Sequence, residues 1–129
     1  MRKWMLAMVI AGFAIGTSLA AAHEGENHSE GQEHGGATQV VTGEVVDLAC
    51  YSGEGAMGPG HRECAQKCIA SGLPVGIKSG NELYLLIGSE HGPVNATFAP
   101  LAAKNVTVEG TVSERDQMHL LAVKKVTVN

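Results

Sequence analysis

Aromatic residues are scarce in this chain, which has one Trp, two Tyr and two Phe among its 129 residues. Trp4 and Phe13 fall in the N-terminal apolar segment, so few aromatics remain for a folded domain. Basic residues are also a minority, with nine Lys and Arg against thirteen Asp and Glu. Single strands of nucleic acid bind in basic grooves with stacking aromatics, and anionic lipid attracts basic surfaces. We therefore expect neither nucleic acid nor anionic lipid as a partner.

Several motifs typical of enzymes and redox proteins are missing from the sequence. It contains no Cys-x-x-Cys pair, so a thioredoxin-type redox centre is unsupported, and no Cys-x-x-Cys-His for covalent haem. Glycine is abundant, but no Gly-rich loop has the spacing of a phosphate-binding loop. The spacings of Ser, His and Asp assemble no catalytic triad. The sequence thus favours a binding protein over an enzyme.

The N-terminus has the residue order of a secretory signal peptide. Two basic residues precede an apolar run from Trp4 to Ile15, and small residues follow. Cleavage after Ala20 or after Ala22 fits these small residues. The alternative is an uncleaved membrane anchor, for which the apolar stretch is barely long enough. With a signal peptide at 1–22, we expect an exported protein, periplasmic or secreted, that is free of the membrane after cleavage.

Residues 23–39 are predicted to form a disordered tail rich in His and Glu, because almost no apolar side chain is present to be buried. The tail histidines His23, His28 and His34 suggest metal capture, and a solvated acidic linker is the alternative. Cleavage after Ala20 would place His23 third in the mature chain. The terminal amine, two amides and that imidazole would then offer a square-planar nitrogen set for Cu(II) or Ni(II).

All three cysteines fall within nineteen residues and are accompanied by a histidine. Cys50 comes first, and His61, Cys64 and Cys68 follow at spacings that return to one face of a helix. Three thiolates and an imidazole suit a soft or borderline transition metal, Cu(I) or Zn(II). One alternative is a disulfide from Cys50 to one of the other two, which leaves a spare thiol. Another is thiol–disulfide exchange by a free cysteine of low pKa, for which Cys64 near the start of the helix is the candidate.

Three other residues lie near this cluster in the sequence. Met57 lies in the Gly-rich loop between Cys50 and His61, where its thioether would favour Cu(I). Asp47 interrupts an apolar strand, and we expect it to face outward; the alternative is that it supports a metal ligand as a hydrogen-bond acceptor. Tyr51 is expected to be a core or rim aromatic.

The patterns after residue 40 predict five strands and two helices. Val40–Ala49 is rich in β-branched residues, with Gly43 as a bend or bulge. A Gly-rich loop at 52–60 leads to a helix over His61–Ser71. The remaining predicted elements are strands at Val75–Lys78, Glu82–Ile87, Asn105–Ser113 and Met118–Val128 and a short helix at Ala96–Lys104. Leu83–Ile87 is nearly all apolar and is expected to be buried throughout. The last strand is expected to carry a bulge between Val123 and Val126.

Five strands with a helix between the third and fourth follow the order of an OB-fold, a small Greek-key barrel. The predicted fold class is therefore mainly β, a small five-stranded OB-like barrel at 40–129 with an inserted Cys/His helix after the first strand. The chain resembles small exported bacterial OB-fold-like proteins of uncharacterised type through Cys50-Tyr51, the Gly-rich loop, His61, Cys64 and Cys68. This resemblance covers roughly residues 40–128, judged from pattern. It implies the fold but no activity.

Together these features predict an exported protein that binds a soft transition metal, copper first and zinc second. It would act as a periplasmic chaperone, buffer or sensor, with a periplasmic protein as its candidate partner. The tail would supply a weaker capture site. The alternative function is a disulfide-stapled structural or interaction module with no metal.

Overall fold

The computed structural model describes residues 36–129 of the chain. The predicted signal peptide at 1–22, and with it His23, His28 and His34 of the predicted tail, lie outside the described residues. The first strand begins at Thr38, two residues before the start predicted from the sequence.

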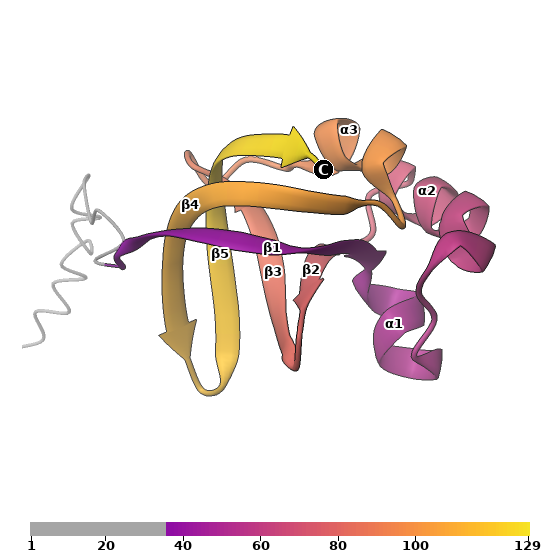
Figure 1. The fold of residues 1–129 in the computed structure, drawn as a ribbon, viewed down its shortest axis with the longest axis horizontal. Helices are drawn as coiled ribbons and strands as arrows, with labels where there is room; N and C mark the ends of the chain where they lie inside the picture. The colour runs from indigo at the N-terminus through magenta and orange to yellow at the C-terminus, as the bar shows by residue number, and fades with distance from the viewer. Residues whose placement is uncertain (1–35) are drawn as a thin grey trace, which may run out of the picture. The chain divides into compact units, whose positions relative to one another are not determined.

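Five strands form a closed barrel in the order β1-β2-β3-β5-β4, which confirms the predicted fold class (Figure 1). Neighbouring strands are antiparallel except β3 and β5, which run parallel. A small closed barrel of this kind leaves no long unpaired strand edge. The strands are β1 (Thr38–Asp47), β2 (Val75–Ser79), β3 (Glu82–Gly88), β4 (Asn105–Arg115) and β5 (Met118–Val128).

The strand β1 closes the barrel because it pairs along both of its edges. Thr38–Glu44 pairs with β4, and Glu44–Asp47 pairs with β2. Gly43 lies where the two pairings meet, and a Cβ atom there would be 2.3 Å from the backbone oxygen of Lys78. The glycine that the sequence suggested as a bend is thus required by a close approach of two strands.

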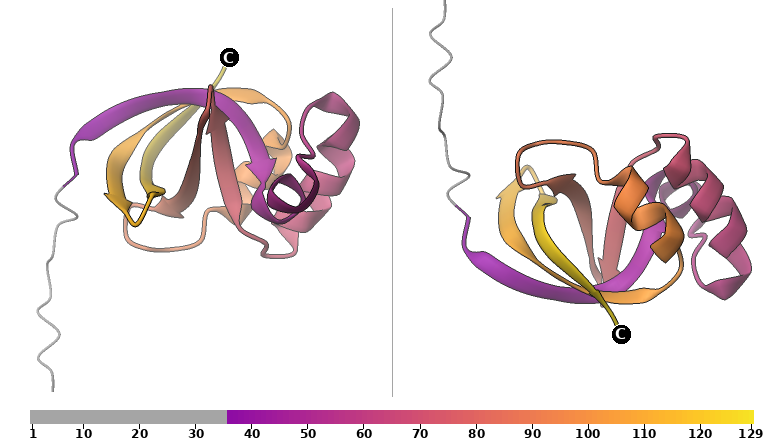
Figure 2. Two further views of the ribbon diagram at one scale, coloured as in Figure 1. Left: turned by 90° about the horizontal axis from the view of Figure 1, so that it is seen from below. Right: turned by 90° about the horizontal axis from the view of Figure 1, so that it is seen from above.

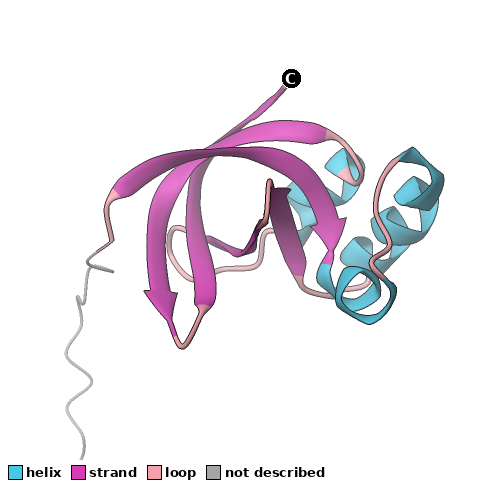
Figure 3. Ribbon diagram, turned by 60° about the horizontal axis from the view of Figure 1, so that its bottom comes forward, coloured by secondary structure: helices cyan, strands magenta, loops and turns pink. Residues whose placement is uncertain are grey.

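Five helical segments interrupt or connect the strands, and Figures 2 and 3 show that they gather on one side of the barrel. Phe98 and Ile69 project from two of these segments into the core and are fully buried. Burying a side chain of this size contributes roughly 1.5–3 kcal/mol. The segments are α1 (Leu48–Glu54), η1 (Pro59–His61), α2 (Arg62–Ala70), α3 (Asn95–Phe98) and η2 (Ala99–Leu101).

Two details of the strands test the sequence patterns. The predicted bulge in the last strand is confirmed, because Glu109 pairs with Lys125 and Gly110 pairs with Val123, which leaves Lys124 as the extra residue. The prediction that Leu83–Ile87 is buried throughout was wrong. In β3 only alternate residues are buried, because the outer face of this strand borders an open pocket.

Candidate metal centre

The carboxylate of Asp47 starts the helix that carries the first cysteine. Asp47 ends β1 and is buried, with 1% of its surface exposed. Its side chain accepts hydrogen bonds from the backbone N–H groups of Ala49 (3.1 Å) and Cys50 (3.3 Å), the bonds of an N-cap. The expectation that Asp47 faces outward was therefore wrong. So was the placement of Cys50 next to the end of a strand, since Cys50 lies in the first turn of α1.

The loop after α1 brings His61 back toward Asp47. The backbone N–H of Gly58 donates to the side chain of Glu44 on β1, so the loop is tied to the barrel. The backbone N–H of His61 donates to the carbonyl of Gly58 at 3.0 Å, which closes the short helix η1. As a result His61 is positioned immediately before α2, the helix that carries the other two cysteines.

The helix α2 is itself fixed against the barrel. Ala65 and Ile69 are its buried residues and belong to the hydrophobic core. The side-chain amide of Asn95, at the start of α3, donates to the carbonyls of Ile69 and Leu73, both at 2.8 Å. These bonds tie the end of α2 and the residues that follow it to α3. The positions of the cysteines on α2 are thus set by core packing and by the Asn95 hydrogen bonds.

The three cysteines come together in the folded chain. The sulfur atoms of Cys50, Cys64 and Cys68 all lie within 4.8 Å of one another. Two thiolates on one tetrahedral Zn(II), each bonded at about 2.3 Å, are about 3.8 Å apart, so a small contraction would let all three bind one ion. All three thiols are free in the described part of the chain, which gives no support to the alternative of a disulfide. Cys50 and Cys68 are half-buried, whereas Cys64 is exposed.

A second group of possible ligands shares one cysteine with the first. It consists of Asp47, Cys50 and His61, whose donor atoms also lie within 4.8 Å of one another. The Nε2 atom of His61 is 3.8 Å from the Oδ2 atom of Asp47, too far for a hydrogen bond. Nε2 is buried and has no hydrogen-bond partner among the described residues. We call Cys50, Cys64 and Cys68 the sulfur triad, and Asp47, Cys50 and His61 the mixed triad.

The surroundings of the sulfur triad favour the protonated thiol in the absence of a cation. Hydrogen bonding to the Asp47 carboxylate raises the pKa of Cys50 to about 12, and burial and the negative charge of Asp47 add to the shift. Burial, followed by the charge of Asp47, raises the pKa of Cys68. These two thiols therefore lack the low pKa needed for thiol–disulfide exchange. A bound cation would reverse the preference, because it stabilises the thiolate directly.

Three further residues, Met57, Tyr51 and His119, belong to neither triad. Met57 is exposed in the loop between α1 and η1, and its part as a ligand remains a prediction. Tyr51 is half-buried on α1, in keeping with a rim position. His119 packs edge to face against Tyr84, with ring centroids 5.3 Å apart.

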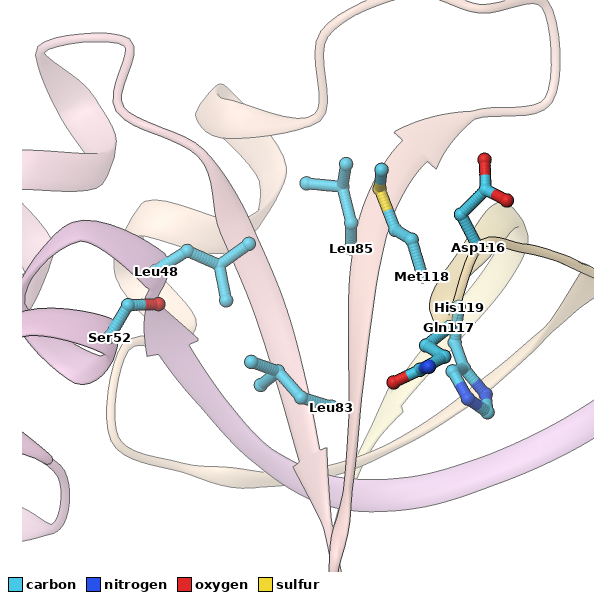
Figure 4. A pocket seen from close by; sticks show the side chains of 8 residues that line it. All are labelled: Leu48, Ser52, Leu83, Leu85, Asp116, Gln117, Met118 and His119. Atoms are coloured by element: carbon cyan, nitrogen blue, oxygen red, sulfur yellow. The ribbon is translucent and has the colours of Figure 1, made fainter.

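A pocket of about 350 Å³ lies on the other side of α1, between this helix, β3 and the turn that joins β4 to β5. Leu48 and Ser52 are one helical turn apart and face this pocket, whereas Cys50, two residues from each, projects to the opposite side of the helix. Figure 4 shows apolar side chains at its centre and the polar residues of the β4–β5 turn at one edge. The pocket is thus separate from both triads. It is lined by Leu48, Ser52, Leu83, Leu85, Asp116, Gln117, Met118 and His119.

Asp47 was considered from the sequence only as an alternative support for a metal ligand, and not as a residue that starts a helix or binds a metal itself. Asp47 and Gly55 are residue types that often begin and end helices, and α1 lies between them. The β-branched run before Asp47 and the glycines after it concealed this signal. No sequence pattern indicated that Asp47 and His61 lie close together, because they are fourteen positions apart in the chain.

Comparison with known proteins supplies no relative for this site. No protein-family model, curated protein or solved structure has significant similarity to the chain. In the part of the chain that the structure describes, no helix is long and apolar enough to cross a membrane.

Proposed function

We propose that this protein is exported and binds a soft transition metal through its Cys/His cluster, copper first and zinc second. It would act as a chaperone, buffer or sensor for that metal. The observation that carries the proposal is the convergence of all three cysteine sulfurs within 4.8 Å of one another. Three thiolates are the soft ligand set that selects Cu(I).

The exposure of Cys64 favours a site that exchanges its metal over one that only stabilises the fold. Structural metal sites are closed by four protein ligands. Here the third sulfur is exposed on α2, where a thiol or thioether of another molecule could reach the ion. Such access suits delivery of the ion to a protein partner of the same compartment. Export itself rests on the N-terminal residue pattern, and the acidic tail with its histidines would be a weaker site for capture.

Titration with Cu(I) against a competing chelator tests this function. The full chain should bind one Cu(I) at the sulfur triad, and the triple variant Cys50→Ser/Cys64→Ser/Cys68→Ser should lose this binding. Removing a group that merely orients a metal ligand costs about 10–100-fold in affinity, so the loss of Cys64 alone should cost at least that much. Cys64→Ser is the cleanest single variant, because this residue is exposed and contributes nothing to the core.

Two further variants sharpen the titration. Met57→Leu keeps the size of the side chain and removes its soft sulfur, so a fall in affinity would assign the thioether to the site. Replacing His23, His28 and His34 with Ala removes the tail as a competing site and should leave Cu(I) binding at the sulfur triad unchanged. Equal Cu(I) affinity in the full chain and the triple Ser variant would refute the proposed function.

A further inference from the structure

We infer that the mixed triad, Asp47, Cys50 and His61, is a second metal position that takes a borderline divalent ion such as Zn(II), and that it competes with Cu(I) at the sulfur triad for Cys50. The inference deepens the proposed function, because Cys50 belongs to both groups. It also adds a ligand, Asp47, that the Cys/His cluster does not include.

The first reason is the state of the imidazole. Nε2 of His61 is buried, yet it has no hydrogen-bond partner among the described residues. A buried polar atom without a hydrogen-bond partner destabilises the folded state, so this nitrogen calls for a partner. The nearest acidic group is Oδ2 of Asp47 at 3.8 Å. Two ligands bonded at about 2.1 Å to one tetrahedral Zn(II) lie about 3.4 Å apart, which is close to the observed separation and longer than a hydrogen bond.

The second reason is that the carboxylate is already oriented. The two N-cap bonds from Ala49 and Cys50 fix Asp47 at the end of β1, and a carboxylate retains lone pairs beyond these two. The histidine is held from the other side by the tie between Gly58 and Glu44. Outer hydrogen bonds that hold ligands in place in this way are a regular feature of metal sites.

The third reason is charge. A divalent ion bound by one carboxylate, one thiolate and a neutral imidazole forms a neutral group, which is the least costly arrangement where Asp47 is buried and Cys50 half-buried. Cu(I) with three thiolates instead carries two net negative charges. The nitrogen, oxygen and sulfur donors of the mixed triad match Zn(II), and the sulfur triad matches Cu(I). The two triads thus divide ions by class, with Cys50 common to both.

Co(II), a coloured substitute for Zn(II), tests the inference in the full chain with His23, His28 and His34 replaced by Ala. The variant Cys64→Ser/Cys68→Ser retains the whole mixed triad and should still bind Co(II), with a charge-transfer band of a single thiolate. Adding His61→Ala should weaken Co(II) binding by at least tenfold, and Asp47→Asn should do the same. His91→Asn is the matched control, because His91 lies in a loop outside both triads and Asn tolerates its left-handed backbone (φ 59°).

The competition is tested by adding Cu(I) to the Co(II)-loaded chain with both triads intact. One Co(II) should be released for each Cu(I) bound, with loss of the charge-transfer band. The inference is overturned if Co(II) binding survives His61→Ala unchanged, or if it disappears in Cys64→Ser/Cys68→Ser. His61 is partly exposed and outside the core, so His61→Ala decides the question even if Asp47→Asn perturbs folding.

The two proposals fail in different ways. If the full chain binds no Cu(I) but Cys64→Ser/Cys68→Ser still binds Co(II), the proposed function fails and the mixed triad stands. If the full chain binds Cu(I), but Co(II) is bound by two or three thiolates and His61→Ala has no effect, the proposed function stands and the mixed triad is refuted.

Discussion

Replacing Asp47 with Asn should lower the pKa of the Cys50 thiol from about 12 toward the 9.0 of an unperturbed thiol. The carboxylate accepts a hydrogen bond from this thiol and places a negative charge beside it, and both effects favour the protonated form. Asparagine is also a strong N-cap residue, so the start of α1 should be preserved. The remaining effect of burial should keep the pKa of Cys50 somewhat above 9.0.

The size of the effect follows from the thiolate fraction. A thiol of pKa about 12 is ionised in roughly one molecule per thousand at pH 9, and a thiol of pKa 9.0 in half of them, so the ceiling is about 500-fold. A neighbouring charge typically shifts a pKa by about one to three units. The thiolate fraction of Cys50 at pH 9 should therefore rise at least about tenfold in the Asp47→Asn variant.

The rate of alkylation by iodoacetamide, measured as a function of pH on the metal-free chain, reports this fraction. The background Cys64→Ser/Cys68→Ser leaves Cys50 as the single thiol, and both forms of residue 47 are compared within it. Asp116→Asn is the matched control, because Asp116 is an exposed carboxylate in the β4–β5 turn whose left-handed backbone suits Asn. An unchanged midpoint for Cys50 alkylation in Asp47→Asn would refute the view that this carboxylate controls the thiol.

Two further predictions concern the barrel. Gly110→Ala would place a Cβ atom 2.3 Å from the backbone oxygen of Ala122, so we expect a loss of roughly 1–3 kcal/mol in urea denaturation. Gly53→Ala, with no described heavy atom within 4 Å of the new Cβ, should be neutral or slightly stabilising, and an equal loss in both variants would contradict the steric reason. The hydrogen bond to Glu82 raises the pKa of Tyr84 to about 12, as do burial and nearby negative charge. Because the pKa of Tyr84 in the folded protein exceeds the usual 10.0, its contribution to stability is fully present below pH 10 and is lost as the pH rises toward 12. In Glu82→Gln the free energy of unfolding should fall less over this pH range. Identical pH profiles of stability in the two proteins would count against this role of Glu82.

Much of the barrel is encoded in local patterns. The strand predicted at Asn105–Ser113 is β4, and the bulge predicted between Val123 and Val126 is the one that the strand pairing places at Lys124. Spacing on a helix likewise placed Cys64 and Cys68 together on α2. Such signals need only the period of the element, 2 for a strand and 3.6 for a helix.

The sequence alone therefore determined the number and order of strands, the helix with two cysteines and the presence of soft metal donors. Only the tertiary structure decided that Asp47 is buried and that Cys50 is shared between two groups of ligands. The reason is that these features depend on contacts between distant segments. The burial of a carboxylate and the distance between two side chains are set by how β1, the loop and α2 pack, and no local period records that packing.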